Sequence, residues 1–216
     1  MKEHATKDFA AWLQASPVIA ILRGVKPEEV VDIGAALIET GIRIIEVPLN
    51  SPDPLTSIKN LAKRYGDQAL IGAGTVVDCT MVKRICQAGG QLTVSPHACA
   101  DVVQKAKVLD MIAVPGFFTP SEAFAMIQAG ADGLKLFPAE AASPAVLKSL
   151  RAVLPRTMPV IPVGSINADN MDPWLEAGAA GFGLGGSLYK PGFTPQKVAK
   201  RARAVMRAIQ PAQAAE

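Results

Sequence analysis

The feature that most constrains this fold is a regular alternation of short apolar runs with amphipathic segments, which extends from Val18 to Ile209. Eight apolar runs rich in β-branched residues recur at intervals of about 24 residues, enough for one strand, one helix and two short loops. Several of the amphipathic segments begin at a proline or a polar capping residue, and several end at glycine. The predicted strands are residues 18–22, 42–47, 69–72, 91–95, 111–114, 133–137, 160–163 and 181–184.

This alternation favours an α/β fold with a parallel sheet, because each strand is followed by a helix that returns the chain to the same end. Eight uninterrupted units favour a closed (β/α)8 TIM barrel, and a doubly wound open sheet is the structural alternative. We expect a single domain over residues 1–216, because no low-complexity segment or linker divides the chain. Residues 1–17 are predicted to be an N-terminal helical extension, with an extra helix around residues 7–15.

Only two histidines, His4 and His97, occur in the 216 residues, and this limits the chemistry. His4 belongs to a polar N-terminal segment, so no group of histidines is available for a catalytic metal ion, and we expect no metal. The three cysteines are an odd number without C-x-x-C spacing, which is typical of a reducing compartment. Two of them, Cys79 and Cys86, have a spacing that favours packing on one helix face.

The sequence also bears on location and on large partners. Its first 17 residues include charged side chains and no long apolar run, and no stretch approaches the roughly 18 apolar residues of a membrane span. We expect a cytoplasmic protein with no membrane partner. A basic block near the C-terminus has a nucleic-acid patch as one interpretation, but apolar residues recur within it at helical spacing. That spacing favours a solvent-exposed basic helix face and no nucleic-acid partner; the basic residues are Lys190, Lys197, Lys200, Arg201, Arg203 and Arg207.

Two charged residues interrupt apolar strands close to their C-terminal ends, where barrels carry their active sites. Glu46 follows Ile44 and Ile45 and precedes Pro48, and Lys135 lies between two leucines before Pro138. An isolated strand lysine usually extends to water. A buried lysine, however, has a lowered pKa, and its neutral amine can attack a ketone to form a Schiff base. A facing glutamate can then move protons, so the pair predicts a catalytic acid–amine site.

Glycine-rich segments at the ends of the last two strands form a second candidate site. Residues 181–186 match G-x-G-x-x-G, but no acidic residue follows at the distance that a dinucleotide site requires, so we expect no nucleotide cofactor. Small residues after strands seven and eight instead match the phosphate site of many barrels, where backbone amides and a helix N-terminus hold the anion. Tight turns without a ligand are the alternative. The candidate phosphate-binding residues are Gly164, Ser165, Gly185, Gly186 and Ser187.

Three further residues follow predicted strands. Arg23 is placed to bind a substrate carboxylate through two hydrogen bonds, and a surface ion pair is the alternative. Thr75 is placed either to hydrogen-bond a substrate or to cap the next helix. His97 is interpreted as a solvated loop histidine rather than a pocket residue.

Several segments together resemble a known family. They are Ile42-Arg43-Ile44-Ile45-Glu46-Val47-Pro48-Leu49-Asn50-Ser51-Pro52, Gly72-Ala73-Gly74-Thr75-Val76, Val114-Pro115-Gly116 and Leu134-Lys135-Leu136-Phe137-Pro138-Ala139. These segments resemble the keto-deoxy-phosphosugar (KDPG/KHG) aldolases, which are class I aldolases on a short (β/α)8 barrel and are typically trimeric. The resemblance extends from about Val18 to Tyr189, and the segment around Lys135 is its most specific part.

The resemblance implies roles for the candidate residues. Lys135 corresponds to the Schiff-base lysine and Glu46 to the general acid/base. Thr75 and Arg23 correspond to residues around the pyruvate half of the substrate. The phosphate loops correspond to Gly164, Ser165, Gly185 and Gly186, with Ser187 beside them. The implied partner is a small phosphorylated keto-deoxy sugar acid, and the implied assembly is a homotrimer.

Within the family the chain resembles the branch that cleaves 2-dehydro-3-deoxy-6-phosphogalactonate to pyruvate and D-glyceraldehyde 3-phosphate. Pro48-Leu49-Asn50 stands where the gluconate branch usually has Thr-Leu-Arg, so Arg23 is the expected carboxylate ligand. Val163 stands where the gluconate branch usually has threonine. Ser165 departs from the usual Gly-Gly, and its β-carbon opposes a glycine-only φ.

Alternative functions remain at this point. One is aldol cleavage of 2-dehydro-3-deoxy-6-phosphogluconate or 4-hydroxy-2-oxoglutarate. Another is a phosphosugar isomerase, epimerase or synthase on a related phosphate-binding barrel, which needs no covalent lysine. The last is a phosphosugar-binding protein without activity.

Overall fold

The protein is an α/β structure in which every paired strand runs parallel to its neighbours. The computed structural model describes residues 8–213, and the side chains of residues 8–209. Each predicted strand overlaps an observed one. The strands are β1 (Val18–Ile21), β2 (Ile44–Pro48), β3 (Leu70–Gly74), β4 (Leu92–Val94), β5 (Ile112–Val114), β6 (Gly116–Phe117), β7 (Leu134–Leu136), β8 (Val160–Pro162) and β9 (Phe182–Leu184).

The strands form a six-stranded sheet, in the order β5-β4-β3-β2-β1-β9, and a three-stranded sheet, in the order β6-β7-β8. The order follows the sequence and places the last strand beside the first, whereas a doubly wound sheet reverses its order. The prediction of one closed eight-stranded barrel is therefore confirmed only in part. The fold is a parallel α/β arrangement, but its strands form two sheets. Between the two sheets, Val163 and Gly183 form an isolated parallel bridge.

The fifth predicted strand, residues 111–114, is followed directly by Pro115, which has no N–H to donate. The Val114 carbonyl accepts a hydrogen bond from the Ser95 amide, but the Pro115 carbonyl accepts one from the Lys135 amide. The chain thus changes its bonding partner from β4 to β7 at this proline, and the short strand β6 was not predicted.

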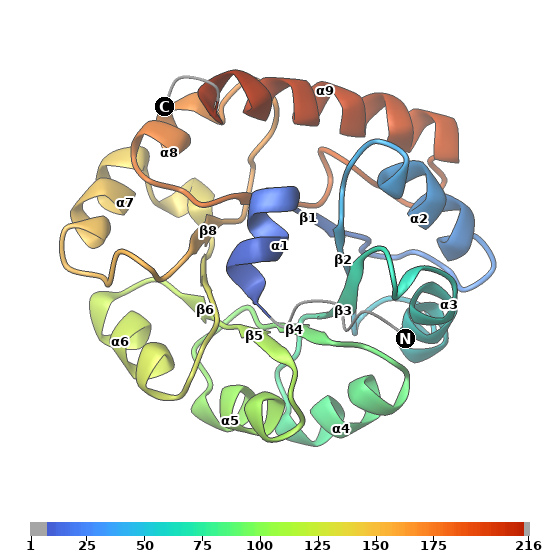
Figure 1. Ribbon diagram of the computed structural model, residues 1–216, viewed down its shortest axis with the longest axis horizontal. Coiled ribbons are helices and arrows are strands. Elements are labelled where there is room, and N and C mark those ends of the chain that lie inside the picture. The colour runs from blue at the N-terminus through green and yellow to red at the C-terminus, as the bar shows by residue number, and fades with distance from the viewer. Residues whose placement is uncertain (1–7, 214–216) are drawn as a thin grey trace.

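The helices surround the strands. Figure 1 shows α2 to α9 as a ring outside the strands, as expected when helices alternate with parallel strands. None of the helices within residues 8–213 is both long and apolar enough to cross a membrane. The helices are α1 (Phe9–Ala15), α2 (Val30–Ile38), α3 (Pro54–Tyr65), α4 (Cys79–Gln87), α5 (Ala100–Val108), α6 (Pro120–Gln128), the 3₁₀ turn η1 (Ala139–Ala141), α7 (Pro144–Arg151), α8 (Asp172–Glu176) and α9 (Pro195–Gln213).

The alternation of side chains along the strands produces two apolar layers. The outer layer lies between strands and helices, and Cys79, Cys86 and Cys99 pack against it as partly buried thiols. On α9 the apolar residues Val198, Ala202 and Val205 belong to this layer, which confirms that the basic residues occupy the other face. The inner layer contains Phe9, Leu13, Ile19, Ile21, Ile44, Leu70, Leu92, Val94, Ile112, Val114, Ile161 and Val163.

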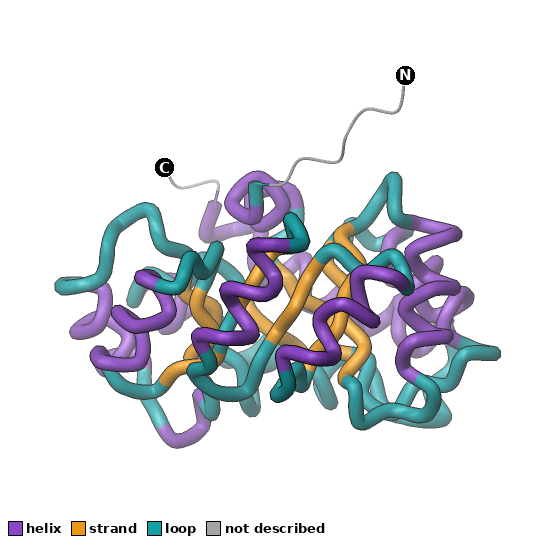
Figure 2. Tube along the Cα trace, turned by 90° about the horizontal axis from the view of Figure 1, so that it is seen from below, coloured by secondary structure: helices purple, strands orange, loops and turns teal. Residues whose placement is uncertain are grey.

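Helix α1 covers one end of the inner layer (Figures 1 and 2). The Asp8 side chain caps it by accepting a hydrogen bond from the Ala10 amide at 2.9 Å. A β-carbon at Gly133 would lie 2.6 Å from the Phe9 ring, so any larger residue at this position would displace the ring. The helix predicted around residues 7–15 is confirmed over Phe9–Ala15, and Lys7 lies outside the described residues.

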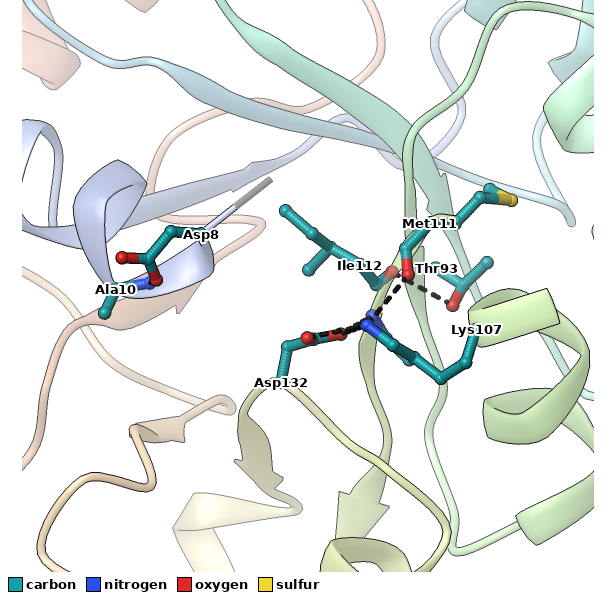
Figure 3. Close-up of polar contacts among 8 residues, drawn as sticks. Asp8, Ala10, Thr93, Lys107, Met111, Ile112 and Asp132 are labelled. Atoms are coloured by element: carbon teal, nitrogen blue, oxygen red, sulfur yellow. Dashed lines mark hydrogen bonds and ion pairs between the residues drawn. The ribbon is translucent and has the colours of Figure 1, made fainter. Parts of the chain in front are cut away.

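A polar cluster at this same end joins α5, β5 and the start of β7 (Figure 3). Lys107 Nζ lies 2.7 Å from both carboxylate oxygens of Asp132 and 3.3 Å from the Met111 carbonyl. Asp132 also accepts a hydrogen bond from the Ala113 amide at 2.8 Å. These bonds join the loop before β7 to α5 and β5.

Candidate active site

Glu46 and Lys135 both face the inner layer. Glu46 follows the inner residue Ile44 by two positions on β2 and is 1% exposed. Lys135 lies on β7 between two outer-layer leucines and is 5% exposed. The lysine therefore does not extend to water, and the structure places an amine and a carboxyl in the same apolar interior.

The charges of this site influence one another. Burial raises the pKa of Glu46 to about 7, although the positive charges of Lys135 and Arg23 oppose the shift. Burial lowers the pKa of Lys135; the carboxylate of Glu46 opposes that shift and the charge of Arg23 adds to it. Lys135 Nζ lies 4.7 Å from the centroid of the Phe137 ring. An acid that titrates near neutrality beside an amine of lowered pKa is suited to nucleophilic and acid–base chemistry.

The carboxyl of Glu46 lies over Gly74 on the neighbouring strand β3. A β-carbon at Gly74 would overlap with both carboxyl oxygens, so the glycine provides the space that this side chain occupies. Within the described residues, Glu46 Oε2 has no hydrogen-bond partner. A buried polar atom without a partner is costly in a folded protein, and a catalytic role is one explanation for keeping such an atom.

Arg23 follows β1 and bonds to residues from the two next loops. Its Nη1 donates to Asn50 Oδ1 at 2.6 Å, and its Nη2 lies 3.4 Å from Thr75 Oγ1. Thr75 has φ 56°, and the cap of α4 is provided by Asp78 rather than by Thr75, so the capping alternative is wrong. Arg23 and Thr75 are thus brought together, as expected of two residues around one substrate group. His97 is exposed in the loop after β4, which confirms its interpretation as a solvated histidine.

The loops after β8 and β9 are adjacent because Val163 pairs with Gly183. Gly164 has φ 126° and Ser165 has φ 52°, so serine adopts here the left-handed conformation that glycine favours. Asn170 supports this conformation by donating from Nδ2 to the Ser165 carbonyl at 2.9 Å. Successive residues with positive φ are typical of loops whose amides face an anion.

The loop after β9 forms a single helical turn. The amides of Leu188 and Tyr189 both donate to the Gly185 carbonyl, at 2.8 Å and 2.9 Å. Gly186 and Ser187 begin this turn, and Arg201 of α9 donates to the Ser187 carbonyl at 2.8 Å. The long helix α9 starts only at Pro195, so a single turn occupies the position where a helix N-terminus was expected.

Three residues in the segments after β2 and β7 were not among the predicted site residues. Ser51 is 7% exposed, and its hydroxyl accepts a hydrogen bond from the Gly24 amide at 2.9 Å. Glu140 places its carboxylate against Gly164, where a β-carbon would overlap with it. The contact of Asn50 with Arg23 depends on a loop-to-loop arrangement that no local sequence signal encodes.

Comparisons with known proteins identify the family of this chain. The family model described as "Aldolase: KDPG and KHG aldolase" matches residues 10–203. A protein of Rhizobium meliloti (strain 1021), named "Probable 2-dehydro-3-deoxy-6-phosphogalactonate aldolase", is 46% identical over 192 residues, which are 89% of this chain and 91% of the relative. The 2-dehydro-3-deoxy-6-phosphogalactonate aldolase of Escherichia coli (strain K12) is 41% identical over 201 residues, 93% of this chain and 98% of the relative. A solved structure described as "Native KDPGal structure" has a TM-score of 0.90 at 41% identity and covers 92% of this chain and 96% of its own. This chain therefore belongs to the KDPG and KHG aldolase family and is a carbon–carbon lyase.

Proposed function

We propose that this protein is a class I aldolase that cleaves 2-dehydro-3-deoxy-6-phospho-D-galactonate to pyruvate and D-glyceraldehyde 3-phosphate. The observation that carries the proposal is the buried pair of Lys135 and Glu46, with the pKa of the amine lowered and that of the carboxyl raised to about 7. Lys135 is the nucleophile and Glu46 is the general acid/base in this proposal.

The first stage forms a covalent adduct. The neutral amine of Lys135 attacks the C2 ketone of the substrate and gives a carbinolamine. Glu46, protonated at a pKa of about 7, donates a proton to the carbinolamine hydroxyl, which leaves as water. The product is an iminium ion on Lys135, and Glu46 is left as the carboxylate.

The second stage breaks the C3–C4 bond. The carboxylate of Glu46 accepts the C4 hydroxyl proton, directly or through one water molecule, and C4 becomes the aldehyde of D-glyceraldehyde 3-phosphate. The bonding electron pair moves to the iminium, which becomes an enamine. Protonation of the enamine at C3 and hydrolysis of the resulting iminium then release pyruvate and restore the amine of Lys135.

The ends of the substrate are assigned to the two groups of loops. Arg23 and Thr75, which are in contact, bind the carboxylate of the pyruvate half. Gly164, Ser165, Gly185, Gly186 and Ser187 bind the phosphate through backbone amides, with the serine hydroxyls beside them. The pairing of Val163 with Gly183 supports this assignment, because it makes the two loops adjacent.

The choice of the galactonate epimer has two supports. The two relatives described above, at 46% and 41% identity, carry the galactonate name. Val163, 7% exposed and in the inner layer, presents an apolar side chain beside the phosphate loops, where it offers no hydrogen bond to a sugar hydroxyl.

Reduction with borohydride in the presence of pyruvate tests the covalent step. We expect intact-mass and peptide analysis to find one reduced pyruvate adduct per chain, on Lys135, and none in Lys135→Met. Absence of the adduct would contradict the Schiff-base mechanism and favour a non-covalent isomerase or epimerase. For the epimer, kcat/KM on the galactonate and gluconate 6-phosphates should favour the galactonate, and Val163→Thr should reduce that preference.

We further propose that the two parallel sheets close into one (β/α)8 barrel domain and that three chains assemble into a cytoplasmic homotrimer. Support for the closure comes from the pairing of β9 with β1, from the Val163–Gly183 bridge and from the continuity of β5 and β6 through Pro115. Support for the trimer comes from the family to which the chain belongs. Light scattering should give about three times the chain mass of 22.6 kDa, and a mass of one chain would contradict the trimer.

A further inference from the structure

The guanidinium of Arg23 is held by a neutral oxygen. Arg23 is exposed, and a side chain of this length is mobile unless other groups restrain it. Its short bond is the one from Nη1 to Asn50 Oδ1, at 2.6 Å, whereas Nη2 lies 3.4 Å from Thr75 Oγ1. A neutral amide oxygen restrains the guanidinium and leaves its positive charge uncompensated, whereas a carboxylate in the same place would neutralise it. The positive charge therefore remains available to an anionic substrate group.

The backbone beneath this contact is also fixed. The residue after Asn50, Ser51, is buried and accepts the Gly24 amide hydrogen bond at 2.9 Å. Gly24 has φ 81°, and a β-carbon there would lie 2.8 Å from Pro191, so this position requires glycine. Two consecutive residues of the β2–α3 loop thus contact two consecutive residues of the β1–α2 loop. Asn50 therefore acts from a fixed support rather than from a free loop.

The position of Arg23 matters to the reacting groups. Its charge lowers the pKa of Glu46 and adds to the lowering of the pKa of Lys135. A displacement of the guanidinium changes both effects together with the binding of the substrate carboxylate.

We propose that Asn50 is a positioning residue of the active site, whose Oδ1 holds the Arg23 guanidinium in the orientation that binds the carboxylate of the pyruvate half. The proposal rests on the role of Arg23 in the proposed function. In this proposal Asn50 does not contact the substrate and affects its binding only through the orientation of Arg23.

A double-mutant cycle tests this proposal, with pyruvate as the probe and borohydride trapping on Lys135 as the measurement. Asn50→Ala should raise the pyruvate concentration for half-maximal trapping by about three- to tenfold, because a charge-assisted bond that orients the cation is lost. Arg23→Ala should raise it further. The double variant should match Arg23→Ala within about twofold, since Asn50 has nothing left to orient.

Asn60→Ala is the matched control. Asn60 Nδ2 donates to the Pro27 carbonyl of the same β1–α2 loop at 3.3 Å, a bond that does not involve Arg23. This variant should leave half-maximal trapping within about twofold of the wild type, whereas an equal effect of both variants would show that Asn50 only stiffens the loop. Melting followed by circular dichroism verifies that the compared variants are folded.

The pH dependence gives a readout that a structural role would not move. Because the Arg23 charge lowers the pKa of Lys135, its displacement raises that pKa, and trapping in Asn50→Ala should begin at higher pH than in the wild type. Unchanged half-maximal trapping in Asn50→Ala, or effects that multiply in the double variant, would overturn the proposal. Failure of the wild type to be trapped would instead overturn the proposed function, so the two failures are distinguishable.

Discussion

Glu46 is the residue at which function and stability oppose each other most directly. Its carboxyl lies in the inner layer with Oε2 unpaired, yet the proposed mechanism requires it to donate and accept protons. Glu46→Gln keeps the shape of the side chain and removes the titration. We expect kcat to fall by roughly 10² to 10⁴, the usual contribution of a general acid/base, and the dependence of kcat on pH near 7 to disappear. An unchanged kcat would contradict the assigned role.

The same substitution should stabilise the fold, with a characteristic pH dependence. The pKa of Glu46 is about 7 in the folded chain and 4.5 without burial, so the native state holds its proton more strongly than the unfolded state. The wild type therefore loses stability as pH rises from 4.5 to 7. Glu46→Gln should gain up to about 3 kcal/mol in free energy of unfolding above pH 7 and nothing below pH 4.5. Denaturant unfolding across this range measures the difference, and a gain that does not depend on pH would contradict the linkage.

At the scale of secondary-structure elements, the site depends on the space between β2 and β3. Gly74 lies outside the left-handed region, and the atoms nearest to a β-carbon at this position are those of the Glu46 carboxyl. Gly74→Ala should turn Glu46 away from Lys135 and lower kcat at least tenfold, while trapping of pyruvate on Lys135 persists. In the Glu46→Gln background the same alanine should have little further effect on kcat, because the two changes disable one group. Multiplicative losses would show that Gly74 acts independently of Glu46.

At this scale, features that follow from periodicity can be predicted from the sequence, whereas contacts between elements cannot. The eight strands and the inward direction of Glu46 and Lys135 follow from periodicity, because burial selects apolar residues on fixed faces. The additional short strand β6 after Pro115 depends on which neighbouring strand shares each hydrogen bond, which is tertiary information. Helix α8 is confined to Asp172–Glu176, because the side chains of Asn167 and Asn170 bond to backbone amides in the preceding turn. Contacts between loops, such as Arg23 with Asn50, have no periodic signal at all.

At the scale of the whole molecule, the two ends of the strands have different tasks. The proposed substrate-binding groups, Arg23, Thr75 and the two glycine-rich loops, follow the C-terminal ends of β1, β3, β8 and β9. The opposite end contains α1 across the inner layer and the Lys107–Asp132 cluster (Figures 2 and 3). This division is typical of βα barrels, in which the N-terminal face provides stability and the C-terminal face provides chemistry.

The division predicts that Asp132 affects stability without affecting catalysis. Asp132→Ala removes the acceptor of the Ala113 amide and the partner of Lys107, a partly exposed pair. The loss should be about 1–3 kcal/mol, which corresponds to a fall in Tm of roughly 3–10 °C for a chain of this size. Asp132→Asn, which keeps an oxygen acceptor for the amide, should lose less.

In both variants kcat/KM should stay within about twofold of the wild type when measured well below Tm, since the cluster lies at the end of the strands opposite the proposed substrate-binding loops. A loss of kcat/KM in the fully folded Asp132→Asn variant would mean that the register of β7, and hence the position of Lys135, depends on this cluster more than on the interior packing.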